Sequence, residues 1–398
     1  MGGRNMKLIP VRPIPPAVFE ELGFYWYRSP EAPEYVAPEM VVIREEEGDS
    51  YYRAAAELYD MFIEAGQYVI DNKLYSLLDI PESLIELIEW TWEDEAHFHI
   101  MGRFDFAGGL EGIPVKLLEF NADTPSTVFE IALVQWMLLK QNGFREEMQF
   151  NSLYEGLKSS FTRLRGLDHR FGNGEGRVGK ALFSCLDYSI EDENTTRLLE
   201  QIAFESGLVT AFEHVHRVYF SPKEGILLDT DSGVVNYDYW FKLIPYEYIG
   251  REEPELARLL TEIVKNRQAV LLNPPYALLF QSKSLLKILW DLFPGHPLLL
   301  ETGFEPLQGR RCVEKKTLSR EGANVTILDG DGTMLEGTAG DYETYRSVFQ
   351  EYVDLAADAH GRLYQAGVFF SYEPCGLGFR RERGIIQDRS QFVGHVVE

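Results

Sequence analysis

Cysteine is scarce in this sequence. Only Cys185, Cys312 and Cys375 occur among the 398 residues, and they lie far apart. A scattered, odd-numbered set supports neither a disulfide framework nor a zinc knuckle, both of which need paired or closely spaced cysteines. We therefore expect three buried, inert thiols in a protein of a reducing compartment.

Basic residues are also in deficit. The chain has 38 Lys and Arg against 63 Asp and Glu, which gives a formal net charge of −25. Phosphate backbones repel such a surface, so we expect no nucleic-acid partner. The charge is compatible with attraction of a small cationic substrate, although a solvated acidic surface is the simpler explanation.

Long apolar runs are missing too. No stretch approaches the 18 uninterrupted apolar residues of a membrane-spanning helix, and the N-terminus lacks the continuous apolar core of a signal peptide. Met6 stands where a myristoylation motif needs Ser or Thr. With 45% hydrophobic residues, the sequence predicts a folded cytoplasmic protein without a membrane partner.

The apolar residues that are present follow the periods of regular secondary structure. The first 40 residues have no such period and read as an extended arm. Steps of three and four residues after Tyr51 and after Pro81 then predict two helices. A two-residue period over 97–106 and 115–122 predicts two adjacent antiparallel strands.

Further elements predict a mixed α/β fold. Thr127 and Glu130 have the spacing of a capping box, so a helix should run from Thr127 to Asn142 and Gly143. Beyond it, strands and helices alternate, which is typical of α/β architecture. The predicted strands are 181–188, 208–212, 311–316 and 324–328, and the predicted helices are 195–206, 254–267 and 283–292.

One glycine-rich segment imitates a phosphate-binding loop. Gly174, Gly176 and Gly179 are followed by Lys180, but a phosphate-binding loop follows a strand and precedes a helix. Here the predicted strand comes after the loop, and Ala181 occupies the position of the magnesium-binding Ser or Thr. We interpret the segment as a flexible turn.

Two histidines imitate a metal site. His97 and His99 fall on one face of a predicted strand, but no third His or Cys has ligand spacing to them. We interpret them as ordinary core or surface residues.

The pattern that indicates chemistry lies on the two predicted antiparallel strands, GRFDF at 102–106 and LLEFNADTPS at 117–126. Alternate residues of a strand share a face, so pairing the strands gathers acidic, amide and guanidinium groups on one surface. Such hard oxygen ligands suit Mg²⁺ shared with nucleotide phosphates, although an ordinary polar strand face is the alternative. The shared surface comprises Arg103, Asp105, Glu119, Asn121 and Asp123.

A second polar group lies late in the chain. Lys283 begins a predicted helix, and Lys315 lies on a strand that leads into a loop with Arg320 and Gly322. Two lysines, a glycine-containing lid and the strand edge at 350–353 are parts of an ATP site, although each alone is commonly structural.

In order along the chain, these segments resemble the synthetase half of the glutathionylspermidine synthase family. The resemblance runs from about residue 26 to the end. It implies a mixed α/β, ATP-grasp-like ligase fold with permuted segment order. The motifs that carry it are GRFDF, LLEFNADTPS with Gln135-Trp136, FKLIPYE at 241–247, QSKSLLKILWDLFP at 281–294, KKTLSREGANV at 315–325, FQEYV at 349–353, CGLGFR at 375–380 and FVGHVV at 392–397.

The resemblance implies a role for each matching residue. Asp105, Glu119 and Asn121 would hold Mg²⁺, and Arg103 and Arg380 would be catalytic. Thr124, Ser126, Glu191 and Asp192 would face the acyl substrate. ATP, the co-substrate, would contact Arg103, Lys283, Lys315, Ser319, Arg320, Glu321, Gly322, Gln350, Glu351, Tyr352, Val353 and Gln365.

The resemblance also divides the chain into four parts. Residues 1–96 would form an N-terminal arm with helices packed on the core. Residues 97–144 would carry the metal and phosphate strands. Residues 145–270 would be an α/β insert on the substrate side, and residues 271–398 the nucleotide-binding part.

The expected activity is ATP- and Mg²⁺-dependent joining of a peptide or amino-acid carboxylate to a polyamine or other amine through an acyl phosphate. Lys316, Ser319 and the Lys242–Glu247 segment depart from the thiol-tripeptide members of the family, which leaves the acid and the amine open. No segment of amidase length precedes the arm, so amidase activity is not expected. A small-molecule kinase and a nucleotide-binding protein without ligase activity are the alternatives.

Overall fold

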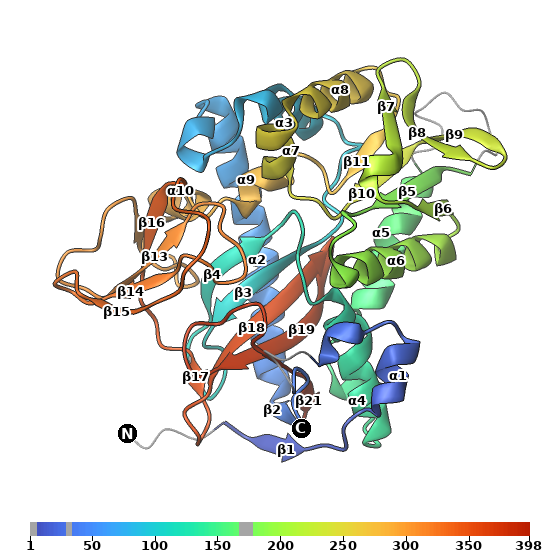
Figure 1. Cartoon of the computed structure of the whole chain (residues 1–398). Coiled ribbons are helices and arrows are strands. Elements are labelled where there is room, and N and C mark those ends of the chain that lie inside the picture. The colour runs from blue at the N-terminus through green and yellow to red at the C-terminus, as the bar shows by residue number, and fades with distance from the viewer. Residues whose placement is uncertain (1–5, 29–33, 167–177) are drawn as a thin grey trace.

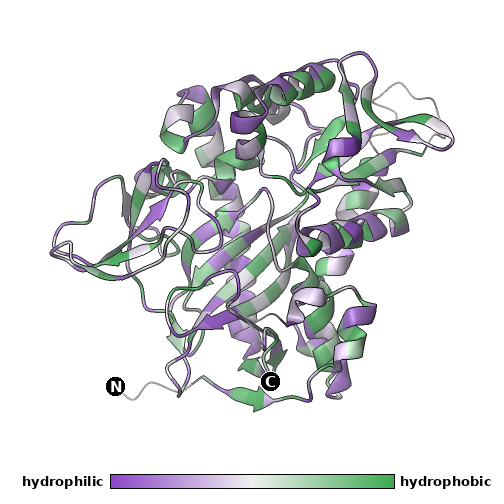
Figure 2. Ribbon diagram, in the orientation of Figure 1, coloured by the Kyte–Doolittle hydropathy of each residue, from purple (hydrophilic) through white to green (hydrophobic). Residues whose placement is uncertain are grey.

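Five β-sheets and the helices between them form a mixed α/β fold in the computed structural model, which describes residues 6–28, 34–166 and 178–398 (Figure 1). This agrees with the fold class predicted from the sequence. Figure 2 shows hydrophilic and hydrophobic residues mixed along the same helices and strands, as expected for elements with one face in a core.

The central sheet carries the strands predicted to bear the chemistry. Its neighbouring strands are antiparallel, and β17 pairs with β18 at the side. Arg103 lies opposite Asn121, and Asp105 lies opposite Glu119, so these side chains share a face as predicted. In spatial order the strands are β20 (Gln391–Val393), β19 (Glu373–Glu382), β18 (Leu363–Ser371), β3 (Gly102–Ala107) and β4 (Lys116–Asn121), with β17 at Ala356–Ala357.

A long helix, α2 (Glu45–Asp71), packs behind this sheet against β18 and β19 (Figure 1). Three glutamates occupy its first turn, where the helix dipole favours negative charge. Its buried face contributes Phe62, which packs edge-on against Phe104. Phe104 in turn stacks on Phe120 at 3.8 Å between ring centroids, so the sheet face opposite Asp105 is closed by aromatic packing.

A small sheet beside the central one combines strands from the N-terminal and C-terminal parts of the chain. β1 (Leu8–Pro10) pairs antiparallel with β2 (Glu39–Ile43), and β2 pairs parallel with β21 (His395–Val397). The expectation of a wholly extended arm is wrong, because α1 (Pro16–Glu21) and a 3₁₀ turn at Tyr25–Tyr27 interrupt it.

The middle of the chain forms a parallel sheet with helices, as its alternating pattern predicts. Its spatial order is β11–β10–β5–β6, and an antiparallel hairpin sheet of β7, β8 and β9 projects beside it (Figure 1). The strands are β5 (Lys180–Ser184), β6 (Val209–Phe212), β7 (Val218–Ser221), β8 (Gly225–Thr230), β9 (Gly233–Tyr237), β10 (Tyr239–Lys242) and β11 (Val270–Leu272). The helices of this region and its neighbours are α3 (Glu82–Glu93), α4 (Gln135–Gln141), α5 (Leu153–Arg165), α6 (Ile190–Glu205), α7 (Tyr246–Glu252) and α8 (Pro254–Lys265).

A separate antiparallel sheet lies across from the central one (Figure 1). Its spatial order is β12 (Thr302–Gly303), β16 (Ser347–Glu351), β13 (Cys312–Lys316), β14 (Thr326–Leu328) and β15 (Met334–Gly337). The short helices α9 (Ala277–Gln281) and α10 (Leu285–Leu292) precede it in the chain. The division of the chain into four parts stays a prediction.

The capping box predicted at Thr127 is wrong. Thr127 has φ 68°, and Glu130 opens a π-helical turn, Glu130–Val134, before α4. Glu130 Oε1 accepts hydrogen bonds from Trp26 and Tyr35. Trp26 and Tyr35 thus bind the Glu130 carboxylate that was predicted to cap the helix. The predicted helix end at Asn142 is confirmed.

Predictions about cysteines and membrane spans can also be compared with the structure. All three cysteines are free and buried, and burial raises the pKa values of Cys185 and Cys375 to about 12. Within the ranges described, no helix has the length and apolar character needed to cross a bilayer.

Candidate functional site

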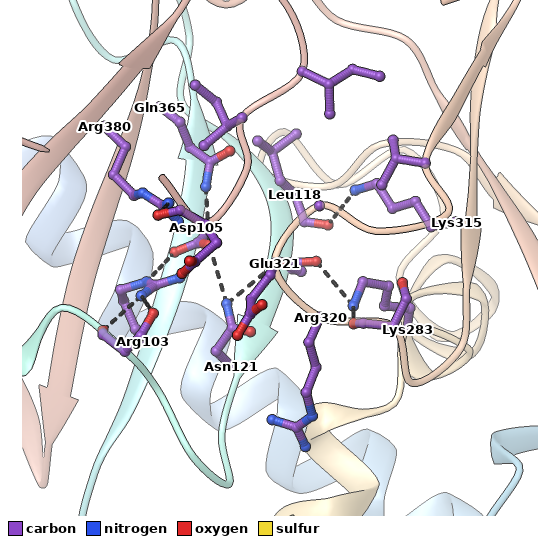
Figure 3. Close-up of a pocket in the computed structure, with 18 of the residues that line it drawn as sticks. Arg103, Asp105, Leu118, Asn121, Lys283, Lys315, Arg320, Glu321, Gln365 and Arg380 are labelled. Atoms are coloured by element: carbon purple, nitrogen blue, oxygen red, sulfur yellow. Dashed lines mark hydrogen bonds and ion pairs between the residues drawn. The ribbon is translucent and has the colours of Figure 1, made fainter. Parts of the chain in front are cut away.

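The residues predicted for the site come together around one cavity of about 510 Å³. It lies between the central sheet, the β12–β16 sheet and the first turn of α6. All 20 candidate residues, gathered from segments between Arg103 and Arg380, line this cavity. Figure 3 shows the central part of it.

The oxygen-bearing side chains meet on β3 and β4. Asp105 accepts a hydrogen bond from Asn121 Nδ2 at 3.1 Å and another from Gln365 Nε2 at 3.0 Å. Asn121 Nδ2 also donates to Glu119 Oε1 at 3.3 Å (Figure 3). Rotation of the Asn121 amide would present its oxygen beside the two carboxylates, which completes a set of oxygen ligands suited to Mg²⁺.

This set contains only two carboxylates. Across the described ranges, no group of three or more His, Cys, Asp or Glu side chains is placed to hold a metal ion. The candidate set therefore matches a site that shares its cation with substrate phosphates, because Mg²⁺ commonly takes one or two carboxylates and completes its shell from phosphates and water.

Two lysines face this set from the other side of the cavity (Figure 3). Lys283, which precedes α10, lies 3.2 Å from Glu119 Oε2 and donates to the Ser319 carbonyl at 2.6 Å. Lys315 on β13 donates to the Leu118 carbonyl at 3.1 Å and to Gln350 Oε1 at 2.8 Å. Both ammonium groups are thereby held beside the carboxylates.

Burial and neighbouring charges shift the pKa values of Glu119 and Lys315. Burial would raise the pKa of Glu119, but the charges of Lys283 and Lys315 outweigh it and lower this pKa to about 2. Burial lowers the pKa of Lys315 to about 8, with Lys283 adding to the effect and Glu119 opposing it. The cavity thus holds one firmly ionised carboxylate and one lysine that titrates close to neutral pH.

Arg103 connects the oxygen set to the loop after β4. Its Nε and Nη2 donate to the two Asp105 oxygens at 2.6 and 2.9 Å, and its Nη1 donates to the Ser126 carbonyl at 2.7 Å. Nη1 also contacts Thr127 Oγ1 at 3.1 Å. Burial would lower the pKa of Arg103, but Asp105 and its neighbours raise it, so the guanidinium stays charged.

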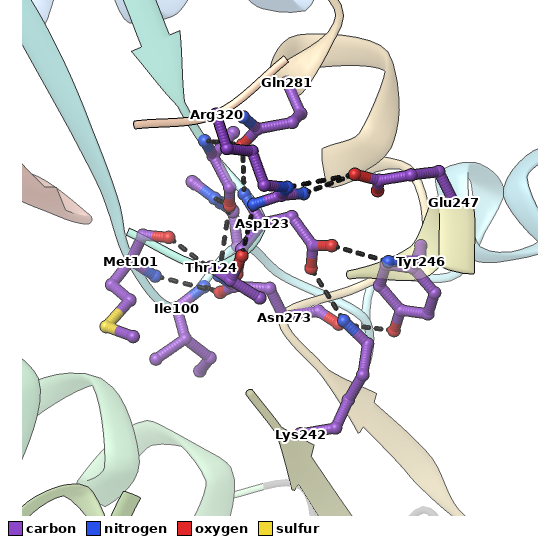
Figure 4. Close-up of polar contacts among 12 residues, drawn as sticks. Ile100, Met101, Asp123, Thr124, Lys242, Tyr246, Glu247, Asn273, Gln281 and Arg320 are labelled. Atoms are coloured by element: carbon purple, nitrogen blue, oxygen red, sulfur yellow. Dashed lines mark hydrogen bonds and ion pairs between the residues drawn. The ribbon is translucent and has the colours of Figure 1, made fainter. Parts of the chain in front are cut away.

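Arg320 lines the cavity, but its guanidinium points away from the two lysines (Figure 3). It donates to Glu247 Oε1 from Nε at 3.0 Å and from Nη2 at 2.7 Å, and to Thr124 Oγ1 at 2.6 Å (Figure 4). Nearby, Gly322 has φ 71°, and a Cβ there would collide with the Ile386 carbonyl oxygen. The loop predicted as a lid is therefore packed against α7 and against the segment after β19.

Asp123 departs from the prediction that it shares the face of Glu119. Its carboxylate turns into the protein, where Oδ1 accepts from Lys242 Nζ at 2.7 Å and Oδ2 accepts from the Tyr246 amide at 2.8 Å (Figure 4). Both charged side chains of this pair are fully buried. Lys242 and Tyr246 belong to the FKLIPYE segment, so that segment fixes the start of the loop carrying Thr124.

A buried amide supports the same loop. Asn273 Oδ1 accepts from the Ile100 and Met101 amides, and its Nδ2 donates to the Met101, Ala122 and Asp123 carbonyls (Figure 4). Sequence reasoning did not identify Asn273, because nothing in its local pattern marks a residue that bridges two distant strands.

Four acidic side chains (Glu191, Asp192, Glu321 and Asp388) and three arginines (Arg320, Arg380 and Arg389) line the end of the cavity nearest α6. Burial, together with the charges of Glu130 and Asp388, raises the pKa of Glu191 to about 8, while Arg389 opposes the rise. Burial, with Glu321 and Asp388, raises the pKa of Asp192 to about 6. Both residues line the cavity, and their predicted role toward a substrate stays a prediction.

Arg380 on β19 lies opposite Gln365 on β18 and lines the same cavity. Its Nη2 donates to the Gln387 and Asp388 carbonyls, while its buried Nε has no hydrogen-bond partner among the described residues. An anion in the cavity would satisfy that orphaned donor.

Several residues that line the cavity were not predicted from the sequence. Aromatic and charged groups include Tyr188, Tyr248, Tyr342, Glu336, Asp388 and Arg389, and apolar groups include Val313, Ile327, Leu355, Leu363, Ile385 and Ile386. Asp388 and Arg389 follow the CGLGFR motif closely, which is the one local signal that would have pointed to them.

The structure can also be compared with the predictions for the glycine-rich segment and for the two histidines. Gly174 and Gly176 lie outside the described residues, while Lys180 begins β5, so a strand follows the glycine segment as predicted. His97 and His99 are buried ahead of β3 rather than on one strand face. His97 Nδ1 bonds Asp94, and His99 Nε2 bonds the Ala122 carbonyl.

Comparison with known proteins agrees with this geometry. A family model described as glutathionylspermidine synthase preATP-grasp matches residues 6–398. A Haemophilus influenzae protein named "putative acid–amine ligase" is 26% identical over 98% of this chain and 99% of its own length. The bifunctional glutathionylspermidine synthetase/amidase of Escherichia coli is 26% identical over 75% of this chain, which spans only 49% of that protein.

A solved structure also resembles the fold. The glutathione synthetase-like effector GSS30 from Globodera pallida superimposes with a TM-score of 0.55 at 12% identity, covering 90% of this chain and 89% of that one. At this identity the likeness concerns the fold alone. The family model covers almost the whole chain, so the resemblance carried by the ordered motifs is confirmed. The chain therefore belongs to the glutathionylspermidine synthase family, a family of acid–amine ligases that form carbon–nitrogen bonds.

Proposed function

We propose that this ligase uses MgATP to convert a substrate carboxylate into an acyl phosphate, which an amine then converts into an amide. The observation that carries the proposal is that one cavity combines carboxylates and an amide on β3 and β4, two lysines facing them, and acidic side chains beside α6.

ATP would lie along the β12–β16 sheet. Lys283 and Lys315 would bind its phosphates, because both ammonium groups are already held at the cavity wall. The segment from Gln350 to Val353 lines the cavity beside apolar side chains, which suits a base with a flat apolar face. Ser319, Arg320, Glu321 and Gly322 would form the loop that covers the phosphates, with Gln365 and Glu351 completing the wall.

Mg²⁺ would be held by Asp105, Glu119 and Asn121, whose oxygen-rich side chains fit this cation. When bound, it would neutralise charge on the phosphate oxygens during transfer. Arg103, fixed by Asp105 and Ser126, would orient the phosphates, and Arg380 would offer its unpaired Nε to the transferring phosphoryl group.

The acid would lie against Thr124 and Ser126, next to the phosphates, and the amine would approach from the side of Glu191 and Asp192. The related proteins are named for joining glutathione to spermidine or for making trypanothione, so a peptide carboxylate and a polyamine are the first pair to test. Closure over the cavity would exclude water, which otherwise hydrolyses an acyl phosphate.

The test is ADP release by the purified protein with MgATP, for a panel of carboxylates crossed with amines, including glutathione with spermidine. We expect amine-dependent ADP release with a new amide mass. ADP release without an amide would favour a kinase, and absence of ATP binding would contradict the proposal.

A double variant tests the metal assignment. Asp105→Asn with Glu119→Gln should abolish magnesium-dependent ATP turnover, because it removes both carboxylates from the proposed set. Glu224→Gln with Asp229→Asn is a matched control, since both acids are exposed on the β7–β9 sheet. Equal turnover in the two variants would show that the cation is held elsewhere.

A further inference from the structure

A buried glutamate, Glu130, acts electrostatically on the cavity-lining Glu191. Glu130 is only 1% exposed, and its Oε1 accepts from Trp26 Nε1 at 2.9 Å and from Tyr35 OH at 2.8 Å. It opens the π-helical turn Glu130–Val134, a type of irregularity that recurs at functional sites. The N-terminal segment thus holds a carboxyl group where apolar packing would otherwise be expected.

Glu191 is the cavity-lining partner of this buried group. It lies in the first turn of α6, and its side chain is 21% exposed. Its Oε2 lies 3.4 Å from Arg389 Nη1, and Glu130 is the neighbouring charge with the largest effect on it. Glu191 can therefore contact a substrate. Glu130 is buried and affects Glu191 through its charge.

The pair adjoins the place where the phosphoryl group would be transferred. Arg103 contacts Asp105 and also Thr127 Oγ1, and Thr127 ends the loop three residues before Glu130. Arg380, on the same central sheet as Arg103, acts electrostatically on Glu130 and pairs in register with Gln365, which bonds Asp105. Arg103, the oxygen-bearing side chains on β3 and β4, and Glu191 line the same cavity, so a substrate activated beside Arg103 shares that cavity with Glu191.

The charged and titratable groups around Glu191 come from four parts of the chain. Burial raises its pKa to about 8, with Glu130, Asp388 and Asp192 raising it and Arg389 opposing them. Burial also raises the pKa of Glu130, which Arg380 lowers. The groups that face the pair are Tyr35, Asp192, Arg380, Asp388 and Arg389.

Amide formation needs a group with these properties. An alkylamine reaches the enzyme as an ammonium ion with a pKa of about 10 and has no lone pair for attack until it loses a proton. An ordinary glutamate, with a pKa of about 4.3, is a poor acceptor from such an acid. A carboxylate whose pKa is about 8 is better matched to the task.

We propose that Glu191 is the catalytic residue that accepts the proton of the attacking amine, and that Glu130 is the positioning residue that sets the charge state of Glu191. The ammonium passes one proton to the Glu191 carboxylate, and the freed nitrogen lone pair forms the bond to the acyl carbon. The bond from that carbon to the phosphate oxygen breaks, and the leaving phosphate takes the second nitrogen proton. Glu191 then returns its proton to solvent.

This inference rests on the proposed ligase function. A comparison of two amines distinguishes failure of this inference from failure of the proposed function. Alkylamines are protonated at pH 7, whereas hydroxylamine is largely neutral and needs no base before attack. In the full-length protein, Glu191→Gln should lower kcat for amide formation with an alkylamine by about 10²-fold or more. With hydroxylamine, measured as hydroxamate, the loss should be much smaller, at most about tenfold.

Glu193→Gln is the matched control. Glu193 belongs to the same helical turn, but it pairs with Arg197 at 2.9 Å and with His214 at 3.3 Å, outside the cavity lining. Its variant should keep the wild-type ratio of the two amines. If Glu191→Gln lowered kcat equally with both amines, this inference would be overturned but the proposed ligase function would not. A wild-type protein that forms neither amide nor hydroxamate would overturn the proposed function as well.

A second variant tests the positioning role. Glu130→Gln keeps an acceptor for Trp26 and Tyr35 but removes the charge that raises the pKa of Glu191. The rise of kcat with pH at saturating alkylamine, centred near pH 8 in the wild type, should move to lower pH. A lower kcat with an unmoved pH profile would show that Glu130 is only structural.

Discussion

Replacing Lys242 with Met would leave a carboxylate buried without its cation. Lys242 Nζ lies 2.7 Å from Asp123 Oδ1, and neither side chain is exposed to solvent. The same ammonium lies 3.4 Å from the centroid of the Tyr246 ring, and the Tyr246 amide donates to Asp123 Oδ2. The variant therefore removes one charge from a site that water does not reach.

The magnitude follows from this burial. Removing one partner of a buried ion pair typically costs about 3–5 kcal/mol, because the remaining charge is desolvated and uncompensated. Met retains most of the aliphatic volume of Lys, so a cavity contributes little to the loss. The hydrogen bond from Tyr246 remains, which places the expected loss of unfolding free energy near the lower end of this range.

Denaturant unfolding followed by tryptophan fluorescence measures the loss. Lys140→Met is the control, because Lys140 forms a surface pair with Glu146 and should shift the midpoint little. Adding Asp123→Asn to Lys242→Met should cost less than the sum of the single changes, since the double variant leaves no unpaired charge. A loss below about 1 kcal/mol for Lys242→Met, or strict additivity, would refute the reasoning.

Two further predictions concern the phosphate end of the cavity. Arg380→Ala should lower the rate of ADP formation by about 10³-fold or more while MgATP still binds by calorimetry, and an unchanged rate would remove Arg380 from phosphoryl transfer. Because burial lowers the pKa of Lys315 to about 8, its positive charge is lost as the pH rises through that value, so kcat/KM for ATP should fall above pH 8. Lys315→Arg, which stays charged, should abolish this fall, and a wild-type kcat/KM that does not change between pH 7 and 9 would contradict the assignment.

The alternating pattern of 102–106 and 117–121 was sufficient to predict the oxygen set. A strand places alternate residues on one face, so the pairing of Asp105 with Glu119 follows once the buried phenylalanines fix which face enters the core. The prediction did not need the rest of the chain, because both strands and the turn between them are local in sequence.

Other features depended on partners that no local pattern encodes. Asp123 continues the alternation, but it lies beyond the end of β4, and Lys242, 119 residues away, draws it inward. Glu130 has the spacing of a capping residue, yet Trp26 and Tyr35 compete successfully for its carboxylate. In each case a buried polar group took a tertiary partner because burial without one is costly.

The distribution of charge along the cavity argues for a ligase rather than a protein that only transfers phosphate. Lys283 and Lys315 occupy one end, where anionic phosphates would lie, and Glu191 and Asp192 occupy the other. Phosphorylating a carboxylate needs MgATP and an acid, and with the proposed Mg²⁺ at Asp105 and Glu119 neither substrate brings a cation to the acidic side chains beside α6. An acidic end beside the phosphoryl-transfer centre is useful when the second substrate arrives as a cation and must lose a proton there, which is the requirement of an amine that attacks an acyl phosphate.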